Sequence, residues 1–190
     1  MTYFVHSTST YNERGRLAGW RDVPLSKLGK KQSMELKRLT KSKRFDAVFS
    51  SDLRRAYETA KTAFGDRNSI VKDRRLREIN FGMFAGKSSK ILDDPEKAIV
   101  WISNPFPGGE SYAESGRRVK SFMRYLLRKH QGKRIAIVAH QAPQLSFEVF
   151  TNHKTWEHAI KTDWRIKDPV RRNGSLSGWR PGWNYTIRKL

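Results

Sequence analysis

The sequence predicts an α/β fold, built as a three-layer sandwich in which helices cover both faces of a mostly parallel central sheet. Short apolar strands alternate with helical segments along the chain, which is typical of parallel sheets joined by crossover helices. Residues 134–139 (RIAIVA) are almost continuously apolar, as expected for a strand buried on both faces. This strand and the N-terminal one each end in a histidine, His6 and His140, where open α/β sheets bind their ligands.

The length and composition of the chain indicate one soluble domain, residues 1–190. This length suffices for one hydrophobic core, and no shift in composition marks a second domain. The sequence contains no cysteine, which excludes disulfides, thiolate catalysis and cysteine-based zinc sites. No apolar run is long enough to span a membrane, and the N-terminus lacks the pattern of a secretory leader, so we predict a cytoplasmic protein with no membrane partner.

The net charge of +21 fits two kinds of anionic partner, a phosphorylated small molecule and a polynucleotide. The lysines and arginines are scattered over the whole chain and form only short clusters. A dedicated nucleic-acid binder usually shows a basic patch, an arm or a recognisable motif. We therefore interpret the charge as a solvated basic surface, with at most weak and non-specific nucleic-acid binding.

The first half of the chain reads as two strand-to-helix units. An apolar strand ends at His6, and a loop rich in Gly, Pro and Asn follows it. Ser26 is a predicted N-cap for a helix to about Thr40. A second strand covers 45–50, and Asp52 is the predicted cap of the helix that carries Arg55 in its first turn.

The second half continues the alternation. We predict a strand at 69–72, a loop at 76–86 that carries Glu78, and at most one short helix between 87 and 105. The turn at 107–111 opens the clearest helix, whose apolar residues recur at helical spacing and form a core stripe. The strand at 134–139 leads into a helix with Pro143 in its first turn. In the tryptophan-rich and basic tail from Lys154, only a final strand near 185–187 can be assigned.

The carboxyl ends of parallel strands meet at one edge of a sheet, so His6, Arg55 and His140 are expected to converge. Each also has a structural alternative. The histidines could be ordinary strand-end residues, and Arg55 and Glu78 could be a surface ion pair. The three other histidines are interpreted as surface residues, because no spacing suggests a metal site, and no cofactor is expected.

Five sequence blocks occur in a fixed order. They are HSTSTYN at 6–12 with GRL and GW shortly after it, SSDLRRAYETA at 50–60, LRE with FG at 76–82, PGGES at 107–111 and VAH at 138–140. Together they resemble the motifs of the histidine phosphatase superfamily, in its phosphoglycerate mutase-like branch. The resemblance covers the chain to about residue 150 and implies a phosphoglycerate mutase-like fold.

The resemblance implies metal-independent hydrolysis of a small phosphomonoester through a phosphohistidine. By this analogy His6 is the nucleophile, Arg55 clamps the phosphoryl oxygens, Glu78 is the general acid and base, and His140 donates to the phosphoryl group. The chemistry requires these types: a neutral imidazole attacks, a planar guanidinium matches phosphate oxygens, and a carboxyl group moves the proton. The predicted substrate-binding residues are Ser9, Asn12 and Gln141, although Ser9 and Asn12 could equally serve only to hold the loop.

The first motif departs from the family pattern. Val5 stands where the family has arginine, and Ser7 stands where it has glycine. Gln141 and Ala142 likewise replace glycines, and Phe84 and Ala85 replace a tryptophan–glutamate pair. One of two usual phosphate-binding arginines is therefore missing, which implies a different substrate, lost catalysis or a compensating cation. The candidates for that cation are Arg14, Arg16, Arg21 and Arg54.

Three functions remain open at this stage. The short 87–106 segment resembles a phosphatase more than a mutase, because mutases usually carry a longer insertion there. A phosphatase is therefore the preferred hypothesis. The alternatives are a catalytically weak or inactive member that binds phosphorylated ligands or RNA through its basic surface, and a phosphoglycerate mutase.

The substitution Val5→Arg tests how the missing arginine affects the site. It would raise activity if no other cation takes the place of that arginine, and would lower activity if another arginine already fills the space.

Overall fold

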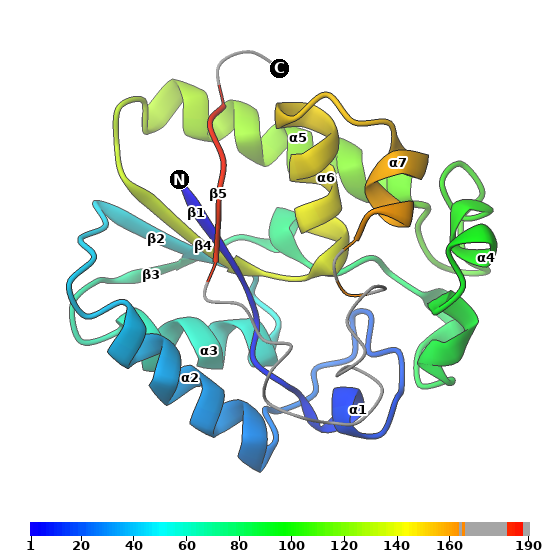
Figure 1. Ribbon diagram of the computed structural model, residues 1–190, viewed down its shortest axis with the longest axis horizontal. Helices are drawn as coiled ribbons and strands as arrows, with labels where there is room; N and C mark the ends of the chain where they lie inside the picture. Colours follow the sequence, from blue (N-terminus) through cyan, green and yellow to red (C-terminus); the bar gives the residue numbers. More distant parts are fainter. Residues whose placement is uncertain (164, 166–181, 188–190) are drawn as a thin grey trace.

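The computed structural model describes residues 1–163, 165 and 182–187. Its centre is a five-stranded sheet with the order β3-β2-β4-β1-β5 (Figure 1). The neighbours among β1 to β4 are parallel, and β5 pairs antiparallel with β1. The strands are β1 (Thr2–Val5), β2 (Ala47–Ser50), β3 (Ile70–Lys72), β4 (Ile135–Ala139) and β5 (Trp183–Asn184). The predicted α/β class with a mostly parallel sheet is confirmed.

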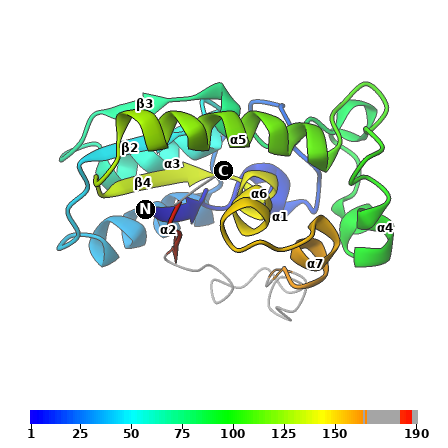
Figure 2. The same ribbon diagram turned by 90° about the horizontal axis from the view of Figure 1, so that it is seen from above.

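Helices cover both faces of this sheet (Figures 1 and 2). On one face α2 (Lys27–Leu39) packs beside α3 (Arg54–Phe64), and on the other α5 (Tyr112–Lys129) packs beside α6 (Gln141–Thr151). The shorter helices are α1 (Thr10–Glu13), α4 (Pro95–Ile99) and α7 (Trp156–Lys161), with 3-10 turns η1 (Arg74–Leu76), η2 (Gly82–Phe84) and η3 (Ser89–Leu92).

The alternation of side chains in the strands builds a separate core on each face. Tyr3 of β1 lies in the cluster formed with α5 and α6, whereas Phe4 lies in the cluster formed with α2 and α3. Val5 packs against the same cluster as Tyr3. All five residues of β4 are buried, because this central strand is covered on both sides.

The predicted helix starts are right at two positions and wrong at one. Ser26 caps α2, and Ser111 forms a capping box with Glu114 at the start of α5. The N-cap of α3 is Leu53 rather than Asp52, and no side chain caps this helix. The carboxylate of Asp52 instead accepts two hydrogen bonds, of 2.8 and 2.6 Å, from Arg77 in the loop that follows β3.

Two predictions concern less regular segments. The 87–105 segment contains one α-helix, α4, as expected, and the 3-10 turn η3 precedes it. The last strand lies at residues 183–184, slightly before the predicted 185–187. Tyr185 still exchanges two backbone hydrogen bonds with Met1, but no described residue of β1 lies opposite Thr186. Much of the tryptophan-rich tail lies outside the described residues. No described helix is both long and apolar enough to cross a membrane.

Candidate active site

His6 directly follows β1, at the edge of the sheet where α6 also begins (Figure 1). Its backbone N–H donates to Ala139 O at the end of β4, at 2.9 Å. Its ring Nδ1 lies 2.7 Å from Ser7 O. A carbonyl oxygen can only accept, so Nδ1 carries the proton of the neutral ring. The lone pair of His6 is therefore on Nε2, the nitrogen that can attack an electrophile.

Ser7 stands where the resemblance leads one to expect glycine, and its hydroxyl is buried. The Ser33 hydroxyl of α2 donates to it at 2.9 Å, and the Thr59 hydroxyl of α3 accepts the Ser7 backbone N–H at 3.0 Å. Gly29 lets α2 approach this loop closely, since a Cβ there would lie 1.9 Å from Thr8 O. The loop after His6 is thus fixed from the α2 and α3 side.

Arg55 lies in the first turn of α3 and is 1% exposed. Its Nε donates to His6 Nε2 at 3.3 Å. The other two guanidinium nitrogens donate to Arg21 O at 3.1 Å and to Gly19 O at 2.9 Å. The loop that follows β1 therefore holds this side chain against the ring of His6, and the pairing predicted for His6 and Arg55 is present.

His140 precedes α6 and is fully buried. Its ring centroid lies 4.9 Å from that of His6. Neither of its ring nitrogens has a hydrogen-bond partner within the described part of the chain. Its backbone is held by the Tyr3 hydroxyl, which donates to His140 O at 2.7 Å and accepts from His140 N at 3.1 Å. Two imidazoles and one guanidinium thus converge at the ends of β1 and β4.

The electrostatics of this cluster keep both rings neutral. Burial, followed by the positive charge of Arg55, lowers the pKa of His6 to about 3. Burial is also the main cause that lowers the pKa of His140 well below its usual value, with Arg55 next. Burial lowers the pKa of Arg55 to about 10, so its guanidinium stays charged at neutral pH. A neutral nucleophile beside a fixed cation is the arrangement that attack on an anionic phosphoryl group requires.

Glu78 reaches the site through the N-terminus of α6. Its Oε1 accepts the backbone N–H groups of Ile79 and Ala142, both at 3.0 Å, and its Oε2 accepts that of Gln141 at 3.2 Å. A carboxylate suits this end of a helix, where unpaired N–H groups and the helix dipole favour negative charge. Glu78 therefore lies against the two residues that directly follow His140, with Oε2 the less engaged oxygen.

The three predicted substrate-binding residues have hydrogen-bond partners in the protein. The Ser9 hydroxyl donates to Asn12 Oδ1 at 2.7 Å and accepts the Asn12 N–H at 3.2 Å, which makes the pair the capping box of α1. The side-chain amide of Gln141 donates to Asp163 Oδ2. These contacts agree with a role of Ser9 and Asn12 in holding the loop, and substrate binding by all three stays a prediction.

Two of the four candidate compensating cations form contacts with other residues. Arg54 forms an exposed ion pair with Glu58 at 2.7 Å, and Arg16 donates to Gly86 O at 3.2 Å. Sequence reasoning missed a different cation, Arg165. This residue is 8% exposed, and its charge is the only one besides that of Arg55 that contributes to lowering the His6 pKa among the described residues. It lies in the tail beyond the recognised motifs, so no sequence pattern predicted its place near the site.

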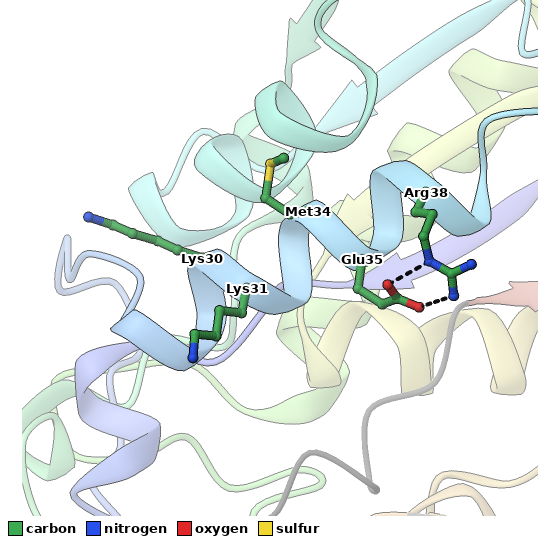
Figure 3. A pocket seen from close by; sticks show the side chains of 5 residues that line it. All are labelled: Lys30, Lys31, Met34, Glu35 and Arg38. Carbon is green, nitrogen blue, oxygen red and sulfur yellow. Dashed lines mark hydrogen bonds and ion pairs between the residues drawn. The ribbon is translucent and has the colours of Figure 1, made fainter.

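Among the described residues, neither metal-ligating side chains nor a surface hollow on α2 offers an alternative to this cluster. They contain no group of three or more side chains arranged to hold a metal ion. Figure 3 shows an open hollow on the outer face of α2. The predicted catalytic residues do not line it, and the Glu35 and Arg38 side chains on its wall pair with each other. Its lining residues are Lys30, Lys31, Met34, Glu35 and Arg38.

Comparison with known proteins shows the family to which the chain belongs. The histidine phosphatase superfamily (branch 1) matches residues 4–147. Phosphoserine phosphatase 1 of Hydrogenobacter thermophilus is 33% identical over 145 residues, which are 73% of this chain and 69% of that protein. The metal-independent phosphoserine phosphatase of Arabidopsis thaliana is 33% identical over 147 residues, 71% of this chain and 61% of that protein.

A solved structure agrees with these matches. Bacillus stearothermophilus YhfR superposes with a TM-score of 0.73 at 26% identity, over 83% of each chain. The fold, the order of the motifs and the sequence matches all lead to the same assignment. The chain belongs to the histidine phosphatase superfamily, in its phosphoglycerate mutase-like branch, and is a phosphoric monoester hydrolase.

Proposed function

We propose that the protein hydrolyses a small phosphomonoester through a phosphohistidine on His6, without a metal ion. The observation that carries this proposal is the orientation of the His6 ring. Its Nδ1 proton is held by Ser7 O, and its Nε2 lone pair lies against Arg55 and beside His140. A phosphoryl group at this point meets a neutral nucleophile and a guanidinium that can bind its oxygens.

In the first step Nε2 of His6 attacks phosphorus, the N–P bond forms and the bond from phosphorus to the ester oxygen breaks. The leaving alkoxide takes a proton from Glu78, whose Oε2 carries it. Arg55 and the ring N–H of His140 bind the phosphoryl oxygens, whose charge they stabilise as the transition state spreads it. The positive charge for this step comes from the protein's own side chains.

In the second step a water molecule attacks the phosphohistidine. Glu78, now a carboxylate, accepts its proton, the N–P bond breaks, and inorganic phosphate leaves with His6 neutral again. The backbone N–H groups that bind the Glu78 carboxylate fix its position between the two steps. Because both relatives described above are named phosphoserine phosphatases, phosphoserine is the first substrate to test.

The decisive experiment measures turnover of p-nitrophenyl phosphate and phosphoserine in EDTA, for the wild type, His6→Ala and His140→Ala. We expect wild-type turnover to survive chelation and to be lost in both variants. Rapid quench with a ³²P-labelled substrate should trap an acid-labile phosphoenzyme in the wild type and none in His6→Ala. Turnover that EDTA abolishes and added metal restores would overturn the proposal. Phosphate binding without turnover would support the inactive-member alternative, and isomerisation of 3-phosphoglycerate the mutase.

A further inference from the structure

A buried ion pair from the C-terminal part of the chain lies beside the start of α6. Arg165 Nη1 donates to both carboxylate oxygens of Asp163, at 2.9 and 3.0 Å, and its Nη2 donates to Gln144 Oε1. The side chains of Arg165 and Asp163 are 8% and 1% exposed. Gln141 donates its side-chain amide to the same carboxylate. The pair is therefore held by two glutamines of α6.

Those two glutamines place the pair next to the catalytic groups. Gln141 directly follows His140, and its backbone N–H donates to Glu78 Oε2 at 3.2 Å. Gln144 lies three residues further along α6, and its backbone N–H donates to His140 O at 3.3 Å. Both anchors of the ion pair thus lie in the first turn of α6, whose N-cap is His140.

Val5, which replaces the arginine of the family's first motif, lies on the same side of the sheet as this ion pair. Tyr3 and Val5 alternate with Phe4 along β1, and both pack in the core cluster shared with α5 and α6. An arginine at position 5 would therefore extend into the side of the sheet on which Arg165 is anchored. The positive charge of Arg165 contributes to lowering the pKa of both Tyr3 and His6, as expected for a guanidinium anchored on this side of the sheet.

We propose that Arg165 is the second cation of the phosphoryl site and supplies, from the α6 side, a positive charge that Val5 does not. This inference rests on the proposed function and concerns how the same site binds its phosphoryl group. A phosphoryl dianion beside Arg55 alone is incompletely neutralised, and a second charge in a buried site acts with little screening. Asp163 orients the guanidinium and offsets part of its charge.

The first test separates the charge of Arg165 from its packing. Inorganic phosphate is the probe, measured by calorimetry and as a competitive inhibitor of p-nitrophenyl phosphate turnover. We expect Arg165→Met to weaken phosphate binding about tenfold to a hundredfold, as for the loss of one charged partner. Arg165→Lys keeps the charge and should retain most of the affinity. Arg117→Met, an exposed arginine on α5, is the control and should bind phosphate as the wild type does.

Asp163→Asn distinguishes an electrostatic role from a structural one. It removes the negative partner, preserves the shape of the side chain and leaves the cation in place. If Arg165 acts through its charge, Asp163→Asn binds phosphate as tightly as the wild type or more tightly, the opposite of Arg165→Met. If the pair only holds the fold, both variants lose affinity and melting temperature together, and the proposal is wrong. Should Arg165→Met fail to fold, Arg165→Lys and Asp163→Asn still decide.

A second test combines the substitutions Val5→Arg and Arg165→Met. In the wild type, Val5→Arg brings a second guanidinium towards Arg165, so kcat/KM should fall. In the Arg165→Met background the same change should raise kcat/KM, about tenfold or more where the new side chain reaches the phosphoryl group. An equal gain from Val5→Arg in both backgrounds would overturn the inference. Absence of turnover in the wild type would overturn the proposed function instead, while phosphate binding would still report on Arg165.

Discussion

The hydroxyl of Tyr3 bonds to both backbone groups of His140, its carbonyl and its N–H. Tyr3 is fully buried in β1, and 137 positions separate it from His140 in the sequence. Because the His140 ring has no partner among the described residues, this backbone anchor and the packing around it fix the ring's place. Tyr3 is thus a positioning residue for His140.

Removing this hydroxyl with Tyr3→Phe should destabilise the fold and slow the reaction. The buried His140 N–H loses its acceptor, and His140 O keeps only the 3.3 Å hydrogen bond from the Gln144 N–H, which costs about 1–3 kcal/mol in the free energy of unfolding. We also expect kcat to fall more than KM rises, because in the proposed mechanism His140 binds the phosphoryl group in the transition state. Urea unfolding and steady-state kinetics check both. The control is Tyr125→Phe, which loses only a long 3.4 Å contact to His130 on α5 and should leave kcat unchanged.

The free energy of unfolding should depend on pH through the two histidines of the site, His6 and His140. Their pKa values are lowered in the folded state, to about 3 for His6, whereas the unfolded chain titrates near 6.5. Below about pH 6.5 the unfolded state binds more protons, so stability is present above this pH and is lost as the pH falls. Each histidine contributes up to about 1.4 kcal/mol per pH unit in this window.

The measurement is the free energy of unfolding of the wild type and His6→Asn between pH 7 and 5, a range chosen to lie above most carboxylate titration. We expect the wild type to lose stability more steeply than the variant as the pH falls. Equal slopes would show that His6 does not stay neutral in the folded state while the unfolded chain takes up its proton.

At the scale of elements, the loop that carries Glu78 is clamped by α5. Arg118 Nη1 donates to Arg75 O at 2.8 Å and to Arg77 O at 2.7 Å, and its Nη2 donates to Glu78 O at 2.9 Å. The guanidinium also pairs with Glu110, whose carboxylate accepts the Asn80 N–H at 2.9 Å. The Arg118–Glu110 ion pair thus provides hydrogen-bond partners for backbone groups before and after Glu78. The position of the Glu78 carboxylate therefore depends on this ion pair.

Arg118→Met should therefore impair both stability and catalysis. It leaves two carbonyls without a donor and removes one of the donors of Glu78 O and of the partly buried Glu110 carboxylate, and we expect a loss of about 2–4 kcal/mol. In the proposed mechanism, substrates with a poor leaving group depend most on protonation by Glu78, so the loss of kcat should be largest for these. Arg117→Met on the same helix is the matched control, since Arg117 is 71% exposed and forms only a 3.5 Å surface pair. Similar effects of the two variants would contradict the clamp.

The elements and the convergence of the site were predictable because they depend on local or periodic features. The Ser26 cap located the start of α2, and the turn at 107–111 with its apolar stripe located α5. Two strands that end in histidine implied that His6 and His140 meet. The contacts that orient these groups were not predictable. The hydroxyl of Tyr3 and the Arg118 clamp act through distant partners or backbone carbonyls, and Arg165 pairs with Asp163 but is anchored on Gln144, 21 positions away. Such contacts leave no periodic pattern in the sequence. The error at Asp52 has the same cause, since a tertiary ion pair with Arg77 replaced the local cap.

At the scale of the whole molecule, the chain carries a net charge of +21, and the ligand that we propose for its active site is an anion. Several of the ion pairs in the described residues are exposed surface pairs, which contribute little to stability. A positive field of this size raises the encounter rate with anionic ligands, and salt screens it over about 8–10 Å at physiological ionic strength. The charge should therefore act on association more than on the chemical step.

The same net charge predicts how the protein binds nucleic acid. Lysines and arginines are dispersed over the chain, and the sequence contains no base-reading motif, so binding should be weak and indifferent to base sequence. With about four phosphate contacts, the association constant should fall roughly a hundredfold between about 50 and 200 mM salt, since each contact contributes about −0.9 to the slope. Fluorescence anisotropy with two duplexes of equal length and unrelated sequence measures both properties. Tight binding that prefers one duplex and persists in high salt would instead mean that a polynucleotide is a specific partner, and that the dispersed charge includes an organised nucleic-acid surface.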